Sequence, residues 1–564
     1  MVNAMVQLRP KDTLQFECGY FELDQGILIQ ATEDVLIKGC GKDETILSFK
    51  DSVNVTGLEA LNIRGITVED LTILDSPGDA FKLKSVKWGT LRGVRAMWSG
   101  GGEPITADNY AEKIHVSCTA PPYNEGDSSP DYTPSSASGR YGIYPVESEN
   151  ILVEDSESIG ASDAGIYVGQ TNTAIIRNSR AAYNVMGFEI ENVQGGEDDN
   201  NIAECNTGAF LIYDLENITR YGDTSVMINN VARNNNTYNF SAGGIVSQIP
   251  PGSGMITLAY DQIDVFNNEF INNTTAGIIH VSYAIFPEGD RPSDRKIDFY
   301  TEGMHVYGNK FENNGNGLQP PSSRDGEEEN VARVLPALVG AKVQAACNNP
   351  QNAGACPTDE TGGFRGAHII FDGLVDEYDP ECPYPLDSEG RPVPKDDDGK
   401  PLYNEAHPNP ECRYNAYKFD TRTEGNPRIV PDWFFSCIDD DNEFAADSVT
   451  FANFNGTKGA NAAIALTACT NPANCPTQEQ IAELEEFPAS FDLTPHQCAT
   501  AYGRNLPPLP PVVIPPFVPS GDLPVAPTPE QLSLKRRFPT ALDLRARARR
   551  RLPGFAFEYL DGGA

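Results

Sequence analysis

The fold is decided by three short segments that share one local pattern at a fixed interval: Gly165-Ile166-Tyr167-Val168, Gly187-Phe188-Glu189-Ile190 and Ala209-Phe210-Leu211-Ile212. Each segment begins 22 residues after the one before it. Polar residues ahead of these segments keep the same interval in two columns, Ser162, Asn184, Asn206 and Ser156, Asn178, Asn200. A fixed period of this length indicates a solenoid, in which each unit buries its apolar face by stacking on the next.

The spacing inside each unit predicts strands. Apolar and polar residues alternate over short stretches, and β-branched residues dominate segments such as 151–153 and 174–176. A unit of 22 residues leaves no room for a crossover helix, and the Leu-x-x-Leu-x-Leu signature of leucine-rich repeats is absent. We therefore expect an all-β, right-handed parallel β-helix. Asn suits its corners because Asn tolerates left-handed backbone angles and its amide can bond the same amide one rung away.

The pattern extends in both directions and divides the chain. Gly142-Ile143-Tyr144-Pro145 lies 23 residues before Gly165, and Met304-His305-Val306-Tyr307 resembles an earlier segment at 263–266. The predicted domains are the β-helix at 1–317, a connecting segment at 318–345, a Cys-rich region at 346–502, a Pro-rich linker at 503–530 and a basic tail at 531–564.

The charge of the chain excludes one class of partner. The 564 residues carry a formal net charge of −38, which would repel nucleic acid phosphates. The acidic runs at 396–398 and 439–441 lack the spaced ligands of an EF-hand loop, so we interpret them as solvated loops.

Cysteine usage indicates an oxidising compartment. Eight of the twelve cysteines lie between Cys347 and Cys498, in a loop-rich stretch without Cys-x-x-Cys metal spacing. This predicts a disulfide-stapled region, with Cys347 to Cys356 and Cys469 to Cys475 as candidate local bridges. We therefore expect a periplasmic or extracellular protein, although residues 1–25 hold no signal peptide and no transmembrane segment is present. The leader would then have been lost by truncation or by a misplaced start codon.

The outward columns of the predicted coil carry the candidate site. Side chains alternate between faces of a strand, so the residue after Ile166 and its equivalents point outward. One outward column reads Lys82, Tyr144, Tyr167, Glu189, Leu211, and its neighbour reads Lys84, Val146, Gly169, Glu191, Tyr213. On rungs about 4.8 Å apart, these groups could supply an acid, a base and a charge stabiliser to a sugar ring lying on the sheet.

Two reaction types fit this face. A uronate lyase would use Lys82 or Lys84 as base and Tyr144 or Tyr167 as acid. A hydrolase would use Glu189 and Glu191 as paired carboxylates. Ca²⁺ is a candidate ion for the substrate carboxylate, with Glu189, Glu191 and Asp214 as its ligands. We also assign Tyr213, Asp163 and Asn192 to substrate binding, and expect the insertion at 101–139 to form a wall of the groove.

A plainer interpretation of the same columns is that polar residues fill the outer face of any solvated sheet. The chain would then be a non-catalytic binding or scaffold protein of the periplasm or cell envelope. Its partner would be a polysaccharide or another envelope component.

Two resemblances refine these hypotheses. The segment at 141–148 is similar to Tyr-Gly-Leu-Asp-Pro-His-Asp of periplasmic mannuronan epimerases, but Tyr144 and Val146 replace the first Asp and the His. The loss of the His disfavours epimerisation by that mechanism. Over residues 40–285, motifs such as those at 160–170 and 189–192 resemble exported bacterial parallel β-helix repeat proteins, which implies fold and compartment.

The last segment resembles a different family. Residues 541–553, Ala-Leu-Asp-Leu-Arg-Ala-Arg-Ala-Arg-Arg-Arg-Leu-Pro, precede Phe557-Glu558-Tyr559-Leu560-Asp561-Gly562-Gly563-Ala564. This is similar to the beginning of FMN-dependent α-hydroxy-acid dehydrogenases, whose substrate tyrosine would correspond to Tyr559. The chain ends where the flavin barrel would begin, so we expect a fusion, frameshift or truncation remnant that binds no FMN.

Overall fold

The structure is a computed structural model. It describes residues 8–122, 126–129, 131–283, 297, 300–317, 342–349, 352, 356–358, 365–373, 436–454, 477–478, 480, 482, 486, 488–498, 509 and 511–518. The basic tail, with Tyr559, and the cysteines at 469 and 475 lie outside this part of the chain.

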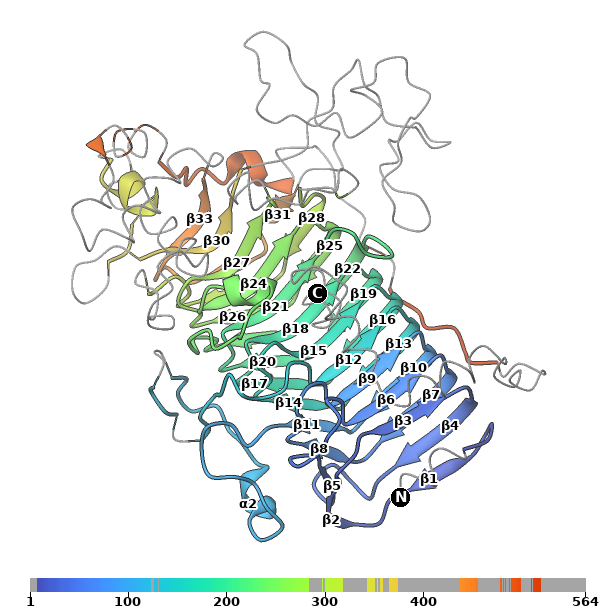
Figure 1. The fold of residues 1–564 in the computed structure, drawn as a ribbon. Coiled ribbons are helices and arrows are strands. Elements are labelled where there is room, and N and C mark those ends of the chain that lie inside the picture. The colour runs from blue at the N-terminus through green and yellow to red at the C-terminus, as the bar shows by residue number, and fades with distance from the viewer. Residues whose placement is uncertain are drawn as a thin grey trace, which may run out of the picture.

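Within the described residues, three parallel sheets of eleven strands each run the length of the molecule (Figure 1). Sheet A contains β1 (Thr13–Gln15), β4 (Glu33–Lys38), β7 (Arg64–Glu69), β10 (Lys87–Arg92), β13 (Glu149–Glu154), β16 (Asn172–Arg177), β19 (Gln194–Asp199), β22 (Asp223–Ile228), β25 (Asp261–Phe266), β28 (Met304–Tyr307) and β31 (Cys437–Ile438). Sheet B contains β2 (Gly19–Glu22), β5 (Thr45–Ser48), β8 (Thr72–Leu74), β11 (Arg95–Met97), β14 (Glu157–Ile159), β17 (Arg180–Ala182), β20 (Ile202–Glu204), β23 (Val231–Arg233), β26 (Glu269–Ile271), β29 (Lys310–Glu312) and β32 (Glu443–Phe444). Sheet C contains β3 (Ile27–Gln30), β6 (Leu58–Leu61), β9 (Phe81–Lys84), β12 (Ile143–Val146), β15 (Ala164–Gly169), β18 (Met186–Glu191), β21 (Gly208–Tyr213), β24 (Ser253–Leu258), β27 (Ala276–Val281), β30 (Ala367–Phe371) and β33 (Val449–Asn453).

Consecutive strands belong to different sheets, so the chain coils once around the molecule for every three strands. The predicted parallel β-helix is therefore confirmed. Helical elements include α2 (Tyr110–Lys113), the 3-10 turns η1 (Ile245–Gln248) and η7 (Thr494–His496), and a helical stretch at 342–347. No helix in this part of the chain is long and apolar enough to cross a membrane.

The repeat aligns like residues from rung to rung. Ile166 pairs with Phe188, and Phe188 pairs with Phe210, in the predicted register. These side chains point into the coil, where they join one hydrophobic core that extends from β3 to β33. The rings of Phe188 and Phe210 stack with centroids 5.0 Å apart. The alternation read from the sequence thus separates the inward column from the outward one.

Asparagine ladders hold the corners, as the columns of the sequence predict. The Asn184 amide donates to Asn206 Oδ1 at 3.0 Å, and Asn206 donates to Asn235 Oδ1 at 3.0 Å. The ladder continues through Asn273 to Asn314. All of these side chains are buried, so each amide satisfies backbone and side-chain groups that water cannot reach.

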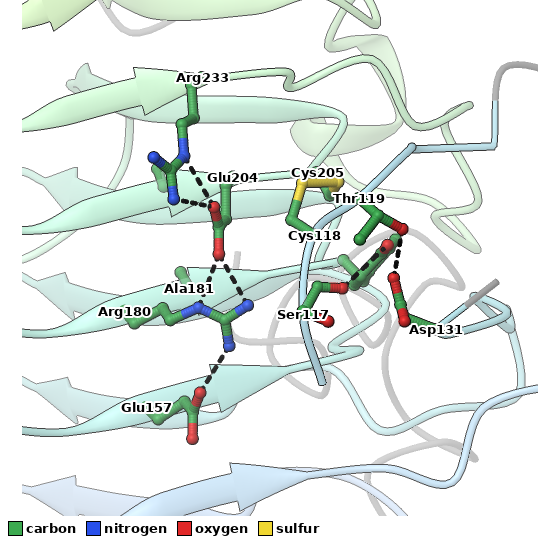
Figure 2. Close-up of polar contacts among 12 residues, drawn as sticks. Ser117, Cys118, Thr119, Asp131, Glu157, Arg180, Ala181, Glu204, Cys205 and Arg233 are labelled. Atoms are coloured by element: carbon green, nitrogen blue, oxygen red, sulfur yellow. Dashed lines mark hydrogen bonds and ion pairs between the residues drawn. A yellow bond between two sulfur atoms is a disulfide. The ribbon is translucent and has the colours of Figure 1, made fainter. Parts of the chain in front are cut away.

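Alternating charges form a ladder on sheet B. Arg180 lies between Glu157 and Glu204 at 2.6 and 2.7 Å, and Arg233 contacts Glu204 at 2.7 Å (Figure 2). Arg95 extends the ladder by pairing with Glu157 at 2.6 Å. Arg95, Glu157 and Arg180 are register partners, as are Glu204 and Arg233. Arg180 reaches Glu204 diagonally, because its own register partner is Ile202. Opposite charges thus meet at each of these contacts.

The insertion at 101–139 packs on sheet B. Its Ile105, Ile114 and Tyr132 form a separate hydrophobic cluster with side chains of that sheet, and Cys118 is bonded to Cys205 (Figure 2). The expectation that Tyr110 and Tyr132 would wall a groove over sheet C is wrong, because the apolar side chains of the insertion cover the outer face of sheet B instead. Tyr123 lies outside the described residues.

The coil also continues beyond residue 317, the boundary predicted from the sequence. Strands β30 to β33 come from the predicted Cys-rich region, yet they pair in register with β27, β28 and β29. Long interruptions between these strands hide the repeat in the sequence. The expected bridge Cys347–Cys356 is confirmed, and Cys18–Cys40 and Cys437–Cys498 are also disulfides.

The buried asparagine ladder can be tested by substitution. Asn206→Ala removes acceptors for the backbone and side-chain N–H groups of Asn184 and leaves the Ala181 carbonyl without its donor. We expect a loss of about 2–4 kcal/mol in the free energy of unfolding, measured with urea. The matched control is Asn178→Ala, which breaks an exposed contact of the same type with Asn200 and should cost less than about 1 kcal/mol. Equal losses would contradict the assignment.

Candidate functional site

The outward face of sheet C gathers most of the predicted residues. Tyr144 lies opposite Lys82, Tyr167 opposite Glu189, and Glu191 opposite Tyr213 in the strand register. The two outward columns therefore stand as the sequence predicts.

The face is covered, however, and the expectation of a solvated face is wrong. Tyr167, Glu189 and Glu191 have exposures of 0%, 1% and 1%. Their face belongs to a second hydrophobic cluster that includes Tyr221 and Phe240, from the segments after β21 and β23. The period of the repeat carries no information about such segments, so sequence reasoning treated the face as open.

Two carboxylates share one phenol at the centre of this face. The Tyr213 hydroxyl lies 2.8 Å from Glu191 Oε2 and 3.3 Å from Glu189 Oε2. The two Oε2 atoms therefore lie no farther apart than the sum of these distances. Gly169 makes room beside them, because a Cβ there would overlap the Tyr167 hydroxyl. That hydroxyl stands close to Glu191, outside hydrogen-bond geometry.

The carboxylates keep unused hydrogen-bonding capacity. Oε1 of Glu189, Oε1 of Glu191 and Oδ1 of Asp163 are buried without a hydrogen-bond partner within the described structure. Buried polar atoms are nearly always satisfied in folded proteins, so three neighbouring exceptions need an explanation. One explanation is a ligand that donates hydrogen bonds to these oxygens.

Burial changes the acidity of all three groups. It raises the pKa of Glu191 to about 7, against the hydrogen bond from Tyr213, which lowers it. It also raises the pKa of Asp163 to about 7, opposed by the charge of Arg140. The pKa of Glu189 is raised well above its ordinary value by burial and by the charges of Asp163 and Glu191. At neutral pH the three groups thus retain protons that exposed carboxyls would lose.

Tyrosines surround the carboxylates. Tyr141 stacks on Tyr144 with ring centroids 4.4 Å apart, and Tyr167 meets Tyr144 edge-on at 4.8 Å. Burial raises the pKa of these phenols and of Tyr213 well above 10, so they remain hydrogen-bond donors. Tyr141 is a member that sequence reasoning missed. Its place directly before the repeated Gly-Ile-Tyr segment is the signal that could have found it.

The lysines are engaged elsewhere. Lys82 pairs with Asp79 at 2.9 Å and lies over the Tyr144 ring, 4.7 Å from its centroid. Lys84 pairs with Glu147 at 3.0 Å. Both ammonium groups are thus held by carboxylates of this chain and do not point freely at the carboxylates of the site.

Asn192 and Asp214 secure a loop. Asn192 accepts from the Leu215 amide at 2.8 Å and donates to the Arg220 carbonyl at 3.0 Å, while the Asp214 carboxylate accepts from the Gly222 amide at 2.9 Å. In the described structure, Glu189, Glu191 and Asp214 are not among the groups whose ligand atoms converge on one point. The residues therefore do not fit the predicted Ca²⁺ site.

Comparison with solved structures finds other proteins of this architecture at low similarity. The A-module of mannuronan C-5 epimerase AlgE6 from Azotobacter vinelandii is 13% identical, with a TM-score of 0.36 over 55% of this chain and 80% of that one. Polygalacturonase from Erwinia carotovora is 10% identical, with a TM-score of 0.31 over 54% and 78%. The similarity concerns the fold alone. No family model and no curated protein sequence matches the chain.

The raised pKa values predict how stability depends on pH. The unfolded chain ionises Glu189 and Glu191 above pH 4.5, whereas the folded chain holds their protons to higher pH. Their contribution is therefore full below pH 4.5 and is lost as pH rises through the folded pKa values. We measure the free energy of unfolding of Glu191→Gln and of the native chain with urea. From pH 4 to pH 8, the value for Glu191→Gln should rise by roughly 1–3 kcal/mol relative to that of the native chain.

Glu312→Gln, at an exposed position, serves as the control and should show no such trend. Asp198 is buried inside the coil, and its pKa is raised to about 8. It is present in the native chain and in Glu191→Gln, so it contributes equally to the pH dependence of stability in both. A difference between the native chain and Glu191→Gln that is the same at pH 4 and pH 8 would contradict the buried, protonated carboxyl.

Proposed function

We propose that the outer face of sheet C is the active site of an exported polysaccharide hydrolase, with Glu189 as its acid and Glu191 as its nucleophile. The observation that carries the proposal is the pair of buried carboxylates that share Tyr213 and leave one oxygen each without a partner. Paired carboxyls with separated acidities are what glycoside hydrolysis requires.

The environments of the two groups assign the roles. Glu189 has the longer contact with the Tyr213 hydroxyl, and burial and the charges of Asp163 and Glu191 raise its pKa, so it holds the proton and donates it to the glycosidic oxygen. Glu191 accepts the shorter hydrogen bond from Tyr213, which stabilises its ionised form as a nucleophile. Two carboxylates that share one hydroxyl are too close for the roughly 6.5–9.5 Å of a pair with a water between them, so the retaining route fits. Glu191 bonds to the anomeric carbon while the leaving sugar takes the proton from Glu189; water then gives its proton back to Glu189, and its hydroxyl displaces Glu191 from the sugar.

The same site can accept an acidic polysaccharide. Because burial keeps carboxyls protonated up to about pH 7, the face lacks much of the charge that would repel a uronate. The phenol groups of the face can donate hydrogen bonds to the polysaccharide. Substrate access requires the segments after β21 and β23 to open, since their side chains pack into the same cluster.

Other chemistries are less well supported. A lyase would need a lysine base, and both lysines are ion-paired. No step uses Ca²⁺, because Asp214 is committed to the Gly222 amide. The four disulfides in the described residues accord with the proposed periplasmic or extracellular location.

A non-catalytic scaffold is the second candidate, and the burial of the whole face is what favours it. In that case the acids and tyrosines on the outer face of sheet C would only pack against the segments after β21 and β23 that cover them.

The experiment incubates the protein with alginate, polygalacturonate and a neutral glucan. Both reducing ends and the ultraviolet absorbance of unsaturated uronate are measured. We expect reducing ends without the absorbance, and a loss of about 100-fold or more in Glu189→Gln and Glu191→Gln. The rate should rise with pH toward about pH 7, as Glu191 ionises, and fall at higher pH, where Glu189 loses its proton. Glu312→Gln should keep full activity. Unsaturated product would support a lyase instead, and no product from any substrate would support the scaffold.

A further inference from the structure

A proline-rich segment, residues 509–518, lies along the outer face of sheet A. In Figure 1 it is the orange-red trace beside the edge-on strands of that sheet. Its backbone is held by four side chains from four strands. Asp264 of β25 accepts from the Leu509 amide at 2.7 Å, and Glu197 of β19 accepts from the Val512 amide at 3.2 Å. Trp88 Nε1 of β10 donates to the Pro515 carbonyl at 2.9 Å, and an Arg64 nitrogen of β7 donates to the Val518 carbonyl at 2.8 Å.

These contacts recur at every third residue. Contacts at residues 509, 512, 515 and 518 have the period of a polyproline II helix, which has three residues per turn. Nine steps of about 3.1 Å give a length of about 28 Å. The six strand-to-strand steps from β7 to β25, at about 4.8 Å each, give about 29 Å. The segment and the stack of rungs therefore match in length.

The side chains are covered unevenly, and the half-buried ones are not confined to the face of residues 509, 512, 515 and 518. Val512, Ile514 and Phe517 are half-buried, whereas Val513 and Val518 remain 70% and 65% exposed. Phe517 lies against Trp88, with ring centroids 5.8 Å apart, and the Arg64 guanidinium lies over the Trp88 ring at 4.6 Å. Gly65 is required beneath them, because a Cβ there would overlap the Phe517 ring.

The segment is bound to the sheet without being part of it. It forms no strand ladder, and the strands beneath it complete their hydrogen bonds with one another. A cavity of about 500 Å³ lies beside residues 512–517, lined by Thr67, Thr90 and Leu152 among others. The surface thus binds the peptide through side chains, and the strands of sheet A do not need the peptide to complete their backbone hydrogen bonds.

We propose that the outer face of sheet A is a binding groove for polyproline II peptides and that residues 509–518 are its resident ligand in cis. Trp88, Arg64, Glu197 and Asp264 recognise the peptide backbone at every third residue. The proposal is independent of the chemistry assigned to sheet C.

The test supplies the ligand in trans. The full chain carries Val512→Asp and Phe517→Asp, which place charges against Glu197 and the Trp88 ring and displace the resident segment. The probe is a labelled peptide with the sequence of residues 507–519, followed by fluorescence anisotropy. We expect saturable binding to this variant at least tenfold tighter than to the native chain, where the tethered segment competes at millimolar effective concentration. Adding Trp88→Ala to the variant, or replacing the prolines of the probe by glycine, should weaken binding at least tenfold.

Absence of saturable binding to a displaced variant with native circular dichroism would overturn the proposal. Equal binding of the glycine probe would also do so, because it would show that the polyproline conformation is not recognised. If the displaced variant does not fold, hydrogen exchange of the chain with Trp88→Ala alone provides the second test. The amides at 509 and 512 should exchange at least tenfold faster than in the native chain, with the strands of sheet A unchanged. Unchanged protection of these two amides would refute the groove.

Discussion

In-register pairing of each coil with the next is the constraint on which the rest of this structure depends. Because parallel strands pair residue by residue, every side chain repeats its environment about 4.8 Å away, and a column must tolerate its own neighbours. Apolar residues meet this requirement because they stack on one another inside the coil. Asparagines meet it because they donate hydrogen bonds to one another at the corners. On sheet B the solution is alternating charge, from Arg95 to Arg233.

The candidate site is the place where this rule is broken. Glu189 and Glu191 stand on one face of β18, with Asp163 nearby, and no positive charge alternates with them. A chain that balances charges on sheet B but buries Glu189 and Glu191 next to Asp163 on sheet C gives up stability there. Such a loss of stability is typical of a functional site, where polar groups are fixed in position to bind a ligand.

Sheet A shows a third use of the same periodicity. Its outer face holds the peptide from β25, β19, β10 and β7, which are two, three and one strand steps apart, and a polyproline helix of ten residues matches this stack in total length. Two sheets of one coil thus carry different surfaces, one built from acids and phenols and one from Trp88, Arg64 and two carboxylates. The coil fixes where the side chains stand, and the segments between strands determine which faces are covered.

The repeat of 22 residues was sufficient to predict the fold, the inward and outward columns and the asparagine ladders, because each is a consequence of local spacing. The columns that contain Glu189 and Glu191 were therefore predictable too. Tertiary structure alone decided that this face is buried, that Asn192 and Asp214 secure a loop, and that the insertion at 101–139 covers sheet B. It also decided that strands after residue 317 complete the coil. These outcomes depend on where irregular segments pack, and that is set by contacts between residues far apart in the chain, which no local period records.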